Sequence, residues 1–86
     1  MPEICRFFGI VILMYFNDHE PPHFHARYGS DSARFEIESL ALLGGSLPAR
    51  VRGLVIEWAA LHREELEGNW VRLRKGRAPL KLDPLQ

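Results

Sequence analysis

The stretch PPHFHARYGSDSARFEIE, residues 21–38, decides the fold that this chain can adopt. It begins with two prolines, which lack a backbone N–H and bar a helix at that point. Two segments with alternating apolar and polar residues follow, 23–28 and 33–38, and the loop between them contains Gly29. Alternation of this kind is typical of strands with one buried face, so the stretch predicts a β-hairpin.

Alternation also assigns the side chains of this hairpin to two faces. Successive residues of a strand point to opposite sides, and residues two apart line up on the same side. We expect the register that keeps the apolar residues of both strands together. The apolar face would contain the pairs Phe24–Ile37, Ala26–Phe35 and Tyr28–Ala33. The polar face would contain the pairs His23–Glu38, His25–Glu36 and Arg27–Arg34.

Shorter apolar segments on both sides of the hairpin add further strands. Residues 3–7 and 10–16 have strand character and are joined at Phe8-Gly9, where glycine allows the positive φ of a tight turn. Residues 41–43 and 80–82 are candidates for short edge strands. The sequence therefore predicts an antiparallel sheet of four to five strands.

The second half of the chain carries the 3.6-residue periodicity of helices. One helix over residues 48–75 would be about 40 Å long, which is too long for so small a domain. We therefore expect two helices with a break between His62 and Asn69, and Gly68 is a candidate for it; one bent helix is the alternative. Gly76 is the expected end of the second helix.

Together these elements predict an α+β fold in a single domain, residues 1–86, with the two C-terminal helices packed on one face of the sheet. Eleven basic and eleven acidic residues cancel, so net charge does not direct the protein to nucleic acid or to a membrane. One cysteine excludes an intramolecular disulfide and a cysteine-rich zinc site. No apolar run is long enough to span a bilayer and no leader is evident, so we expect a cytoplasmic protein. The high hydrophobic content, 47%, favours a homo-oligomer or a hetero-complex.

Three of the four histidines lie within residues 17–29, together with carboxylates. His23 and His25, two apart on a strand, match the geometry that binds zinc, manganese or iron through imidazole nitrogens. Glu36 and Glu38 across the hairpin are further candidate ligands, and Asp18, His19 and Glu20 lie in the preceding loop. The alternative is that each histidine pairs with the opposite glutamate on a solvated face. We expect no cofactor other than this possible transition metal.

The same side chains suit a metal-independent ribonuclease. His23 and His25 could act as acid and base, with Glu36 as their orienting or basic partner. Arg27 and Arg34 could hold the phosphate, because guanidinium groups bind phosphate oxygens in a bidentate manner.

Several motifs spread over nearly the whole chain are shared with one bacterial family. The motifs are RFFGI (6–10), MYF (14–16), DH (18–19), PPHFH (21–25), YG (28–29), EWA (57–59), LHREEL (61–66) and NW (69–70). In these residues the chain resembles the family known as domain of unknown function 4160.

The resemblance implies a small cytoplasmic bacterial protein, often encoded beside a second small protein of the domain of unknown function 2442 type, in what is proposed to be a toxin–antitoxin-like pair. We therefore expect a partner-binding component of such a two-gene module. Its partner would dock around residues 18–28, including Asp18, His19 and Tyr28, and on Arg34 and Glu36. An RNA-cleaving toxin and a transition-metal-binding protein are the alternatives. The family name brings no established activity, so whether the protein is an enzyme stays open.

Overall fold

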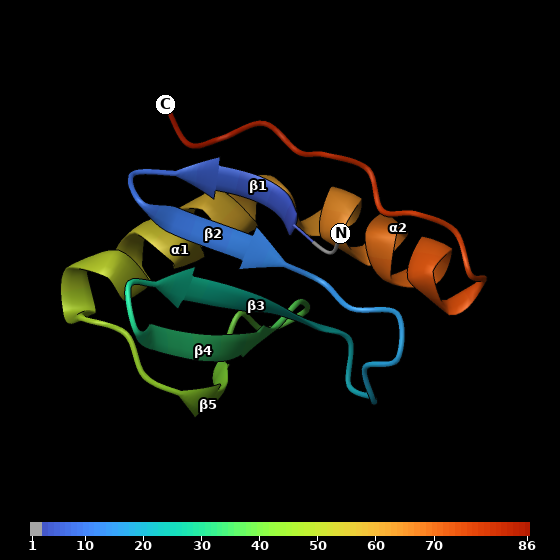
Figure 1. Cartoon of the computed structure of the whole chain (residues 1–86), viewed down its shortest axis with the longest axis horizontal. Helices are drawn as coiled ribbons and strands as arrows, with labels where there is room; N and C mark the ends of the chain where they lie inside the picture. The colour runs from blue at the N-terminus through green and yellow to red at the C-terminus, as the bar shows by residue number, and fades with distance from the viewer. Residues whose placement is uncertain (1–2) are drawn as a thin grey trace.

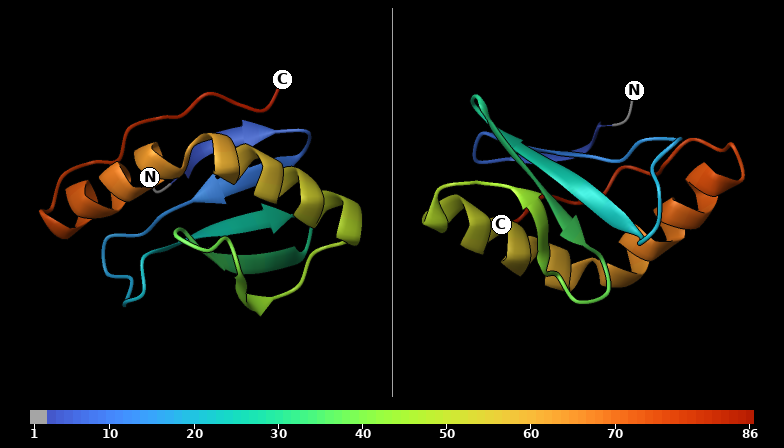
Figure 2. Two further views of the ribbon diagram at one scale, coloured as in Figure 1. Left: turned by 180° about the vertical axis from the view of Figure 1, so that it is seen from behind. Right: turned by 90° about the horizontal axis from the view of Figure 1, so that it is seen from below.

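The computed structural model describes residues 3–86 and confirms the predicted α+β fold (Figure 1). The elements are β1 (Glu3–Phe7), β2 (Ile10–Leu13), β3 (His23–Tyr28), β4 (Asp31–Glu36), β5 (Leu42–Gly45), α1 (Ala49–Leu61) and α2 (Arg63–Arg74). The strands form one antiparallel sheet in the order β1-β2-β3-β4-β5. Helix α1 lies against one face of this sheet, and α2 continues beyond the ends of the strands (Figure 2). Within residues 3–86, neither helix is long and apolar enough to cross a membrane.

The β3–β4 hairpin forms, but its predicted register is wrong by two residues. Tyr28 faces Asp31, and the turn contains only Gly29 and Ser30. Gly29 has a φ of 60°, a conformation that costs glycine little. The two-residue turn can therefore begin at Gly29. The observed pairs are His23–Glu36, Phe24–Phe35, His25–Arg34, Ala26–Ala33, Arg27–Ser32 and Tyr28–Asp31.

The shift preserves the predicted division into two faces, because a slip of two residues returns every side chain to its own side. Phe24, Ala26 and Phe35 are buried in the core. The new register nevertheless separates Arg27 from Arg34, so the predicted pair of opposed guanidinium groups does not form. Glu38 lies beyond the end of β4.

Strand β2 ends at Leu13, three residues before the predicted end. Continuing the β2–β3 register would place Phe16 opposite Pro22, which has no N–H to donate. The chain instead leaves the sheet and forms the loop of residues 14–22, which returns to the start of β3. This loop forms one side of the site described below.

The core lies between the sheet and the helices, and Trp58 of α1 is at its centre. The Trp58 ring is fully buried against Phe24 and Phe7, with ring centroids 6.1 and 5.7 Å apart. Phe24 also stacks on Phe35 at 5.5 Å. Aromatic contacts of this kind add to the free energy gained from burial alone.

The helical half consists of two helices, and the break lies at His62 rather than at Gly68. His62 leaves the helical conformation at φ −121° and ψ 22°, and its ring packs on Trp58. The Nδ1 atom of His62 bonds to Glu65 in the first turn of α2. Gly68 lies inside α2, whereas Gly76, with φ 75°, follows its end as predicted.

Residues 80–82 do not form the predicted strand. They belong to an extended C-terminal segment that runs beside β1 (Figure 1). The N–H of Leu82 donates to the carbonyl of Ile4 at 2.9 Å, and the buried amide of Asn69 bonds to both backbone groups of Leu80. Trp58 Nε1 donates to the Asp83 carbonyl at 2.8 Å. One backbone hydrogen bond to β1 and the side chains of Asn69 and Trp58 therefore hold this segment.

Replacing Gly68 by alanine should stabilise the protein by about 0.5–1 kcal/mol, because alanine restricts the unfolded chain and favours a helix interior. A Cβ at this position would have no atom within 4 Å. The matched substitution Gly76→Ala should destabilise by about 1–2 kcal/mol, because Gly76 is in the left-handed region. Urea unfolding of the three proteins measures both changes. Destabilisation by Gly68→Ala would contradict the position of the helix break.

Candidate functional site

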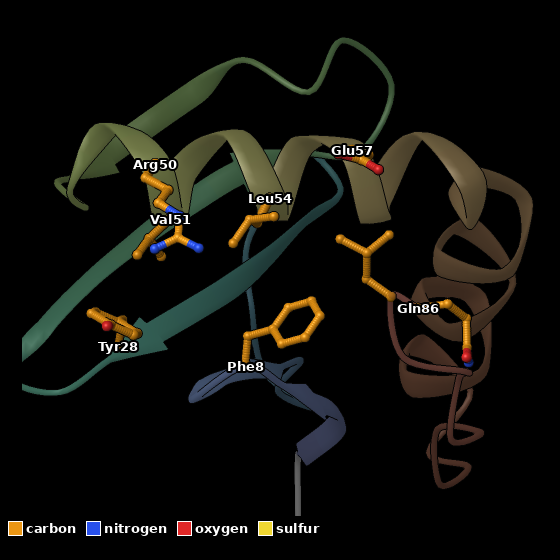
Figure 3. Close-up of a pocket in the computed structure, with 8 residues that line it drawn as sticks. Phe8, Tyr28, Arg50, Val51, Leu54, Glu57 and Gln86 are labelled. Carbon is orange, nitrogen blue, oxygen red and sulfur yellow. The ribbon is translucent and has the colours of Figure 1, made fainter.

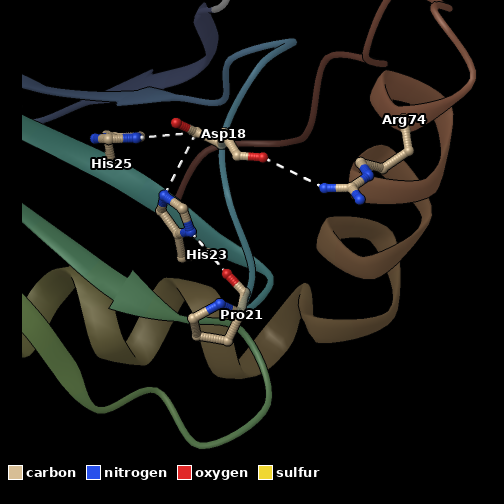
Figure 4. Close-up of polar contacts among 5 residues, drawn as sticks. All are labelled: Asp18, Pro21, His23, His25 and Arg74. Atoms are coloured by element: carbon tan, nitrogen blue, oxygen red, sulfur yellow. Dashed lines mark hydrogen bonds and ion pairs between the residues drawn. The ribbon is translucent and has the colours of Figure 1, made fainter.

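Asp18, His23 and His25 form a cluster where the 14–22 loop meets β3 (Figure 4). Strand alternation directs both histidines to the face opposite Phe24. The loop brings the Asp18 carboxylate to them, with Oδ2 3.0 Å from His25 Nε2 and 3.4 Å from His23 Nε2. The three candidate ligand atoms all lie within 4.8 Å of one another.

The hydrogen bonds of His23 define which of its nitrogens carries a proton. Nδ1 lies 2.8 Å from the Pro21 carbonyl oxygen, which can only accept, so Nδ1 is the donor. In the neutral ring, Nε2 therefore carries a lone pair, and this lone pair faces the Asp18 carboxylate. His23 is only 5% exposed, so bulk water does little to weaken the repulsion between two facing acceptors.

His25 is less buried than His23 and lies at the open side of the cluster. Its side chain is 23% exposed, and Tyr15 packs edge-on against its ring at 4.7 Å. Burial lowers the pKa of His25; the hydrogen bond and the charge of Asp18 oppose this shift, while nearby His23 and Arg34 add to it. Loss of water thus outweighs the carboxylate, and the neutral imidazole is favoured.

Helix α2 forms a second layer around the cluster. The Trp70 ring packs on His23 with centroids 5.4 Å apart. Arg74 donates to the Asp18 backbone carbonyl at 3.3 Å (Figure 4). It also lies 3.8 Å from the Glu20 carboxylate. The Arg74 guanidinium also lies 5.7 Å from the Trp70 ring centroid, within cation–π range. One helix face thus contacts both the histidine and the loop that carries Asp18.

The other predicted site residues on this face lie outside the cluster. Glu36 is opposite His23 in the register, but its carboxylate accepts a hydrogen bond from Ser39. Arg34 faces His25 across the strands, and its guanidinium extends over Gly44 of β5. Arg27 and His19 are exposed. The carboxylate that the structure brings to the histidines is therefore that of Asp18.

Tyr28 lies at the other end of β3, on the face that the helices cover. It lines a cleft of about 370 Å³ together with Phe8, Arg50 and Leu54 (Figure 3). This cleft contains charged groups from α1 but none of the histidines. Tyr28 and the Asp18–His23–His25 cluster therefore belong to separate surfaces.

Two contributors to the site were missed from the sequence, Trp70 and Arg74. Their four-residue spacing on a helix does place them on one face, and this was the available signal. It does not reveal which part of the sheet that face contacts, because the contact with His23 spans more than forty residues of chain. Asp18 was predicted as a binding residue, without its contact to both imidazoles.

In the metal-free protein, substituting Asp18 by asparagine should lower the pKa of His25 further, because a charge that raises it is removed. A folded-state pKa below the ordinary value of about 6.5 means that the unfolded chain takes up the proton more readily. The free energy that neutral His25 contributes to folding is therefore fully present above about pH 6.5, and it is lost as the pH falls through the folded-state pKa. NMR titration of the His25 ring protons measures the shift. Glu20→Gln is the control and should leave the His25 pKa unchanged. A higher His25 pKa in Asp18→Asn would contradict the conclusion that the Asp18 carboxylate raises it.

A family described as domain of unknown function (DUF4160) matches residues 9–71. No curated protein and no solved structure matches the chain. The matched segment covers β2 to β5, α1 and most of α2, and it contains Asp18, His23 and His25. The chain belongs to the DUF4160 family.

Proposed function

We propose that this protein binds a divalent first-row transition metal ion through His23, His25 and Asp18. One observation carries the proposal: Nε2 of the buried His23, whose Nδ1 donates to the Pro21 carbonyl, lies 3.4 Å from the Asp18 carboxylate. In the neutral ring both atoms are acceptors and repel each other unless a cation, either a metal ion or a second ring proton, lies between them. A metal ion removes the repulsion without charging the buried imidazole.

The dimensions of the cluster fit such an ion. A tetrahedral ion with bonds of about 2.0–2.1 Å keeps neighbouring ligand atoms about 3.3 Å apart. The two distances from Asp18 Oδ2, 3.0 and 3.4 Å, are close to that value. His23 and His25 lie on one strand, with ring centroids 5.1 Å apart, and their candidate ligand atoms and that of Asp18 all lie within 4.8 Å of one another.

The surroundings of the ligands favour the same function. Ligating histidines commonly donate their second ring N–H to a carbonyl, which orients the ring, and the Pro21 carbonyl fulfils this role for His23. Two imidazoles and one carboxylate suit zinc or ferrous iron, and three protein ligands leave a position for water or a substrate. His25 donates from Nε2 to Asp18 in the metal-free state, so metal binding requires its proton to move to Nδ1 or to leave.

Chelator-treated protein without a histidine tag should bind Zn²⁺ with one-to-one stoichiometry in calorimetry, and Co²⁺ should give the visible absorption of a low-symmetry site. His23→Ala should weaken binding by more than about 100-fold, because loss of a second-layer partner alone costs about 10–100-fold. His19→Ala is the matched control, since His19 is exposed and lies outside the cluster. Equal affinity of the two variants for Zn²⁺ would contradict the proposal.

A second candidate function is acid–base cleavage of RNA without a metal. It is favoured by the 3.0 Å contact between Asp18 and His25, because a carboxylate can orient a histidine that transfers a proton. Arg34 faces His25, and exposed Arg27 lies on the same side of β3. Asp18 takes the orienting role that the sequence suggested for Glu36.

A third candidate is the partner-binding component of a two-gene module. Its support is that Tyr15 and Phe16 are exposed aromatic residues next to the cluster, and aromatic side chains are enriched at protein interfaces. The small protein encoded by the neighbouring gene is the proposed partner.

One substitution, His25→Ala, separates these functions in a protein that circular dichroism shows to be folded. Loss of RNA cleavage measured with chelator present supports acid–base catalysis, and a wild-type protein without such cleavage excludes it. Loss of co-purification with the neighbouring protein alone supports partner binding. Loss of Zn²⁺ affinity alone supports the metal site.

A further inference from the structure

The sheet has one covered edge and one open edge. Along β1, the C-terminal segment lies beside the strand and bonds to it through the Leu82 N–H and the Ile4 carbonyl (Figure 1). Leu82 is buried and Trp58 holds Asp83, so the helices fasten this cover in place. A strand of another molecule cannot pair along β1 without displacing it.

The outer side of β5 has no strand beside it among residues 3–86. Seen from this side, β5 lies in front of α1 and is not covered by either helix (Figure 2, right). An edge strand leaves the N–H and C=O groups of its outer side without sheet partners. These groups are available to a further strand.

The residues of β5 itself include none of the charged types that usually prevent strand pairing, although the Arg34 guanidinium reaches over Gly44 from β4. No Asp, Glu, Lys or Arg occurs in residues 39–49, although charged residues form 26% of the chain. Leu42 and Leu43 are instead 41% and 38% exposed. Natural proteins normally protect an edge strand with proline or with a charged residue such as lysine, because an exposed apolar edge can pair with a strand of another molecule. The strand itself has four residues, so the leucines must contribute much of any contact.

We propose that the β5 edge pairs with β5 of a second copy of this chain, antiparallel across a two-fold axis, and so joins two sheets into one of ten strands. A two-fold axis places the same residues opposite each other, and the residues of β5 itself are uncharged. The two β4 backbones would lie about 14 Å apart at about 4.8 Å per strand. The Arg34 guanidinium reaches from β4 over Gly44 of β5, so it is the charge nearest the axis, and the pairing of the strands must outweigh the repulsion between its two copies. Because β1 is covered, the assembly closes at two copies and does not extend into a fibre.

Sedimentation equilibrium of the full chain, with a chelator present to exclude metal-bridged species, tests this proposal. The wild type should approach twice the chain mass of 9.9 kDa as its concentration rises through the micromolar range. Leu43→Lys, which places like charges near the two-fold axis, should weaken dimerisation by at least tenfold. Val71→Lys is the matched control, because Val71 is 50% exposed on α2 and should leave the dimer intact.

Hydrogen exchange of the wild type keeps the test decisive if Leu43→Lys does not fold. The backbone amides of β5 should become protected as the concentration rises, while those of the Phe8-Gly9 turn should not change. A wild type that stays monomeric at millimolar concentration would overturn the proposal, as would a dimer without protection in β5. A monomer that forms a complex only with the neighbouring protein would assign this edge to a different partner and would equally overturn self-pairing.

Discussion

The Phe24 ring packs against Phe35 and Trp58, and this contact constrains the rest of the structure. With Phe24 in the core, alternation directs His23 and His25 to the opposite face of β3. A slip by one residue would bury the two histidines under α1 and expose the phenylalanine, at a cost of several kcal/mol for the lost aromatic burial alone. The core thus determines where the imidazoles lie.

The core positions the histidines, but the cluster also requires the 14–22 loop and α2. The loop supplies Asp18 and the Pro21 carbonyl, which together contact both imidazoles. Trp70 covers His23, and Arg74 bonds to the loop beside it. Water is therefore excluded from one side of the cluster, where electrostatic interactions become stronger, while His25 stays accessible from the other side.

The periodicity of the sequence was sufficient to predict the sheet, the two helices and the division of β3 and β4 into two faces. The register was wrong because apolar matching tolerates a slip of two residues, and the conformation of Gly29 decided between the alternatives. The break lies at His62, the first residue of the predicted interval, and not at Gly68. No glycine or proline marks His62 in the sequence, and its ring packs on Trp58, a contact that periodicity does not reveal. The sequence favoured Glu36 as the carboxylate beside the histidines, and the path of the loop, which alternation does not reveal, brings Asp18 there instead.

In the proposed metal site, His23 presents an unprotonated Nε2 to a cation shared with Asp18 and His25. Long-range ¹H–¹⁵N NMR of the imidazole rings measures this directly, first in metal-free protein and then with one equivalent of Zn²⁺. His23 should keep its proton on Nδ1 in both states, and Zn²⁺ should shift the Nε2 resonances of His23 and His25 together. A His23 ring with its proton on Nε2, or Nε2 resonances that Zn²⁺ leaves unchanged, would contradict the proposed metal site.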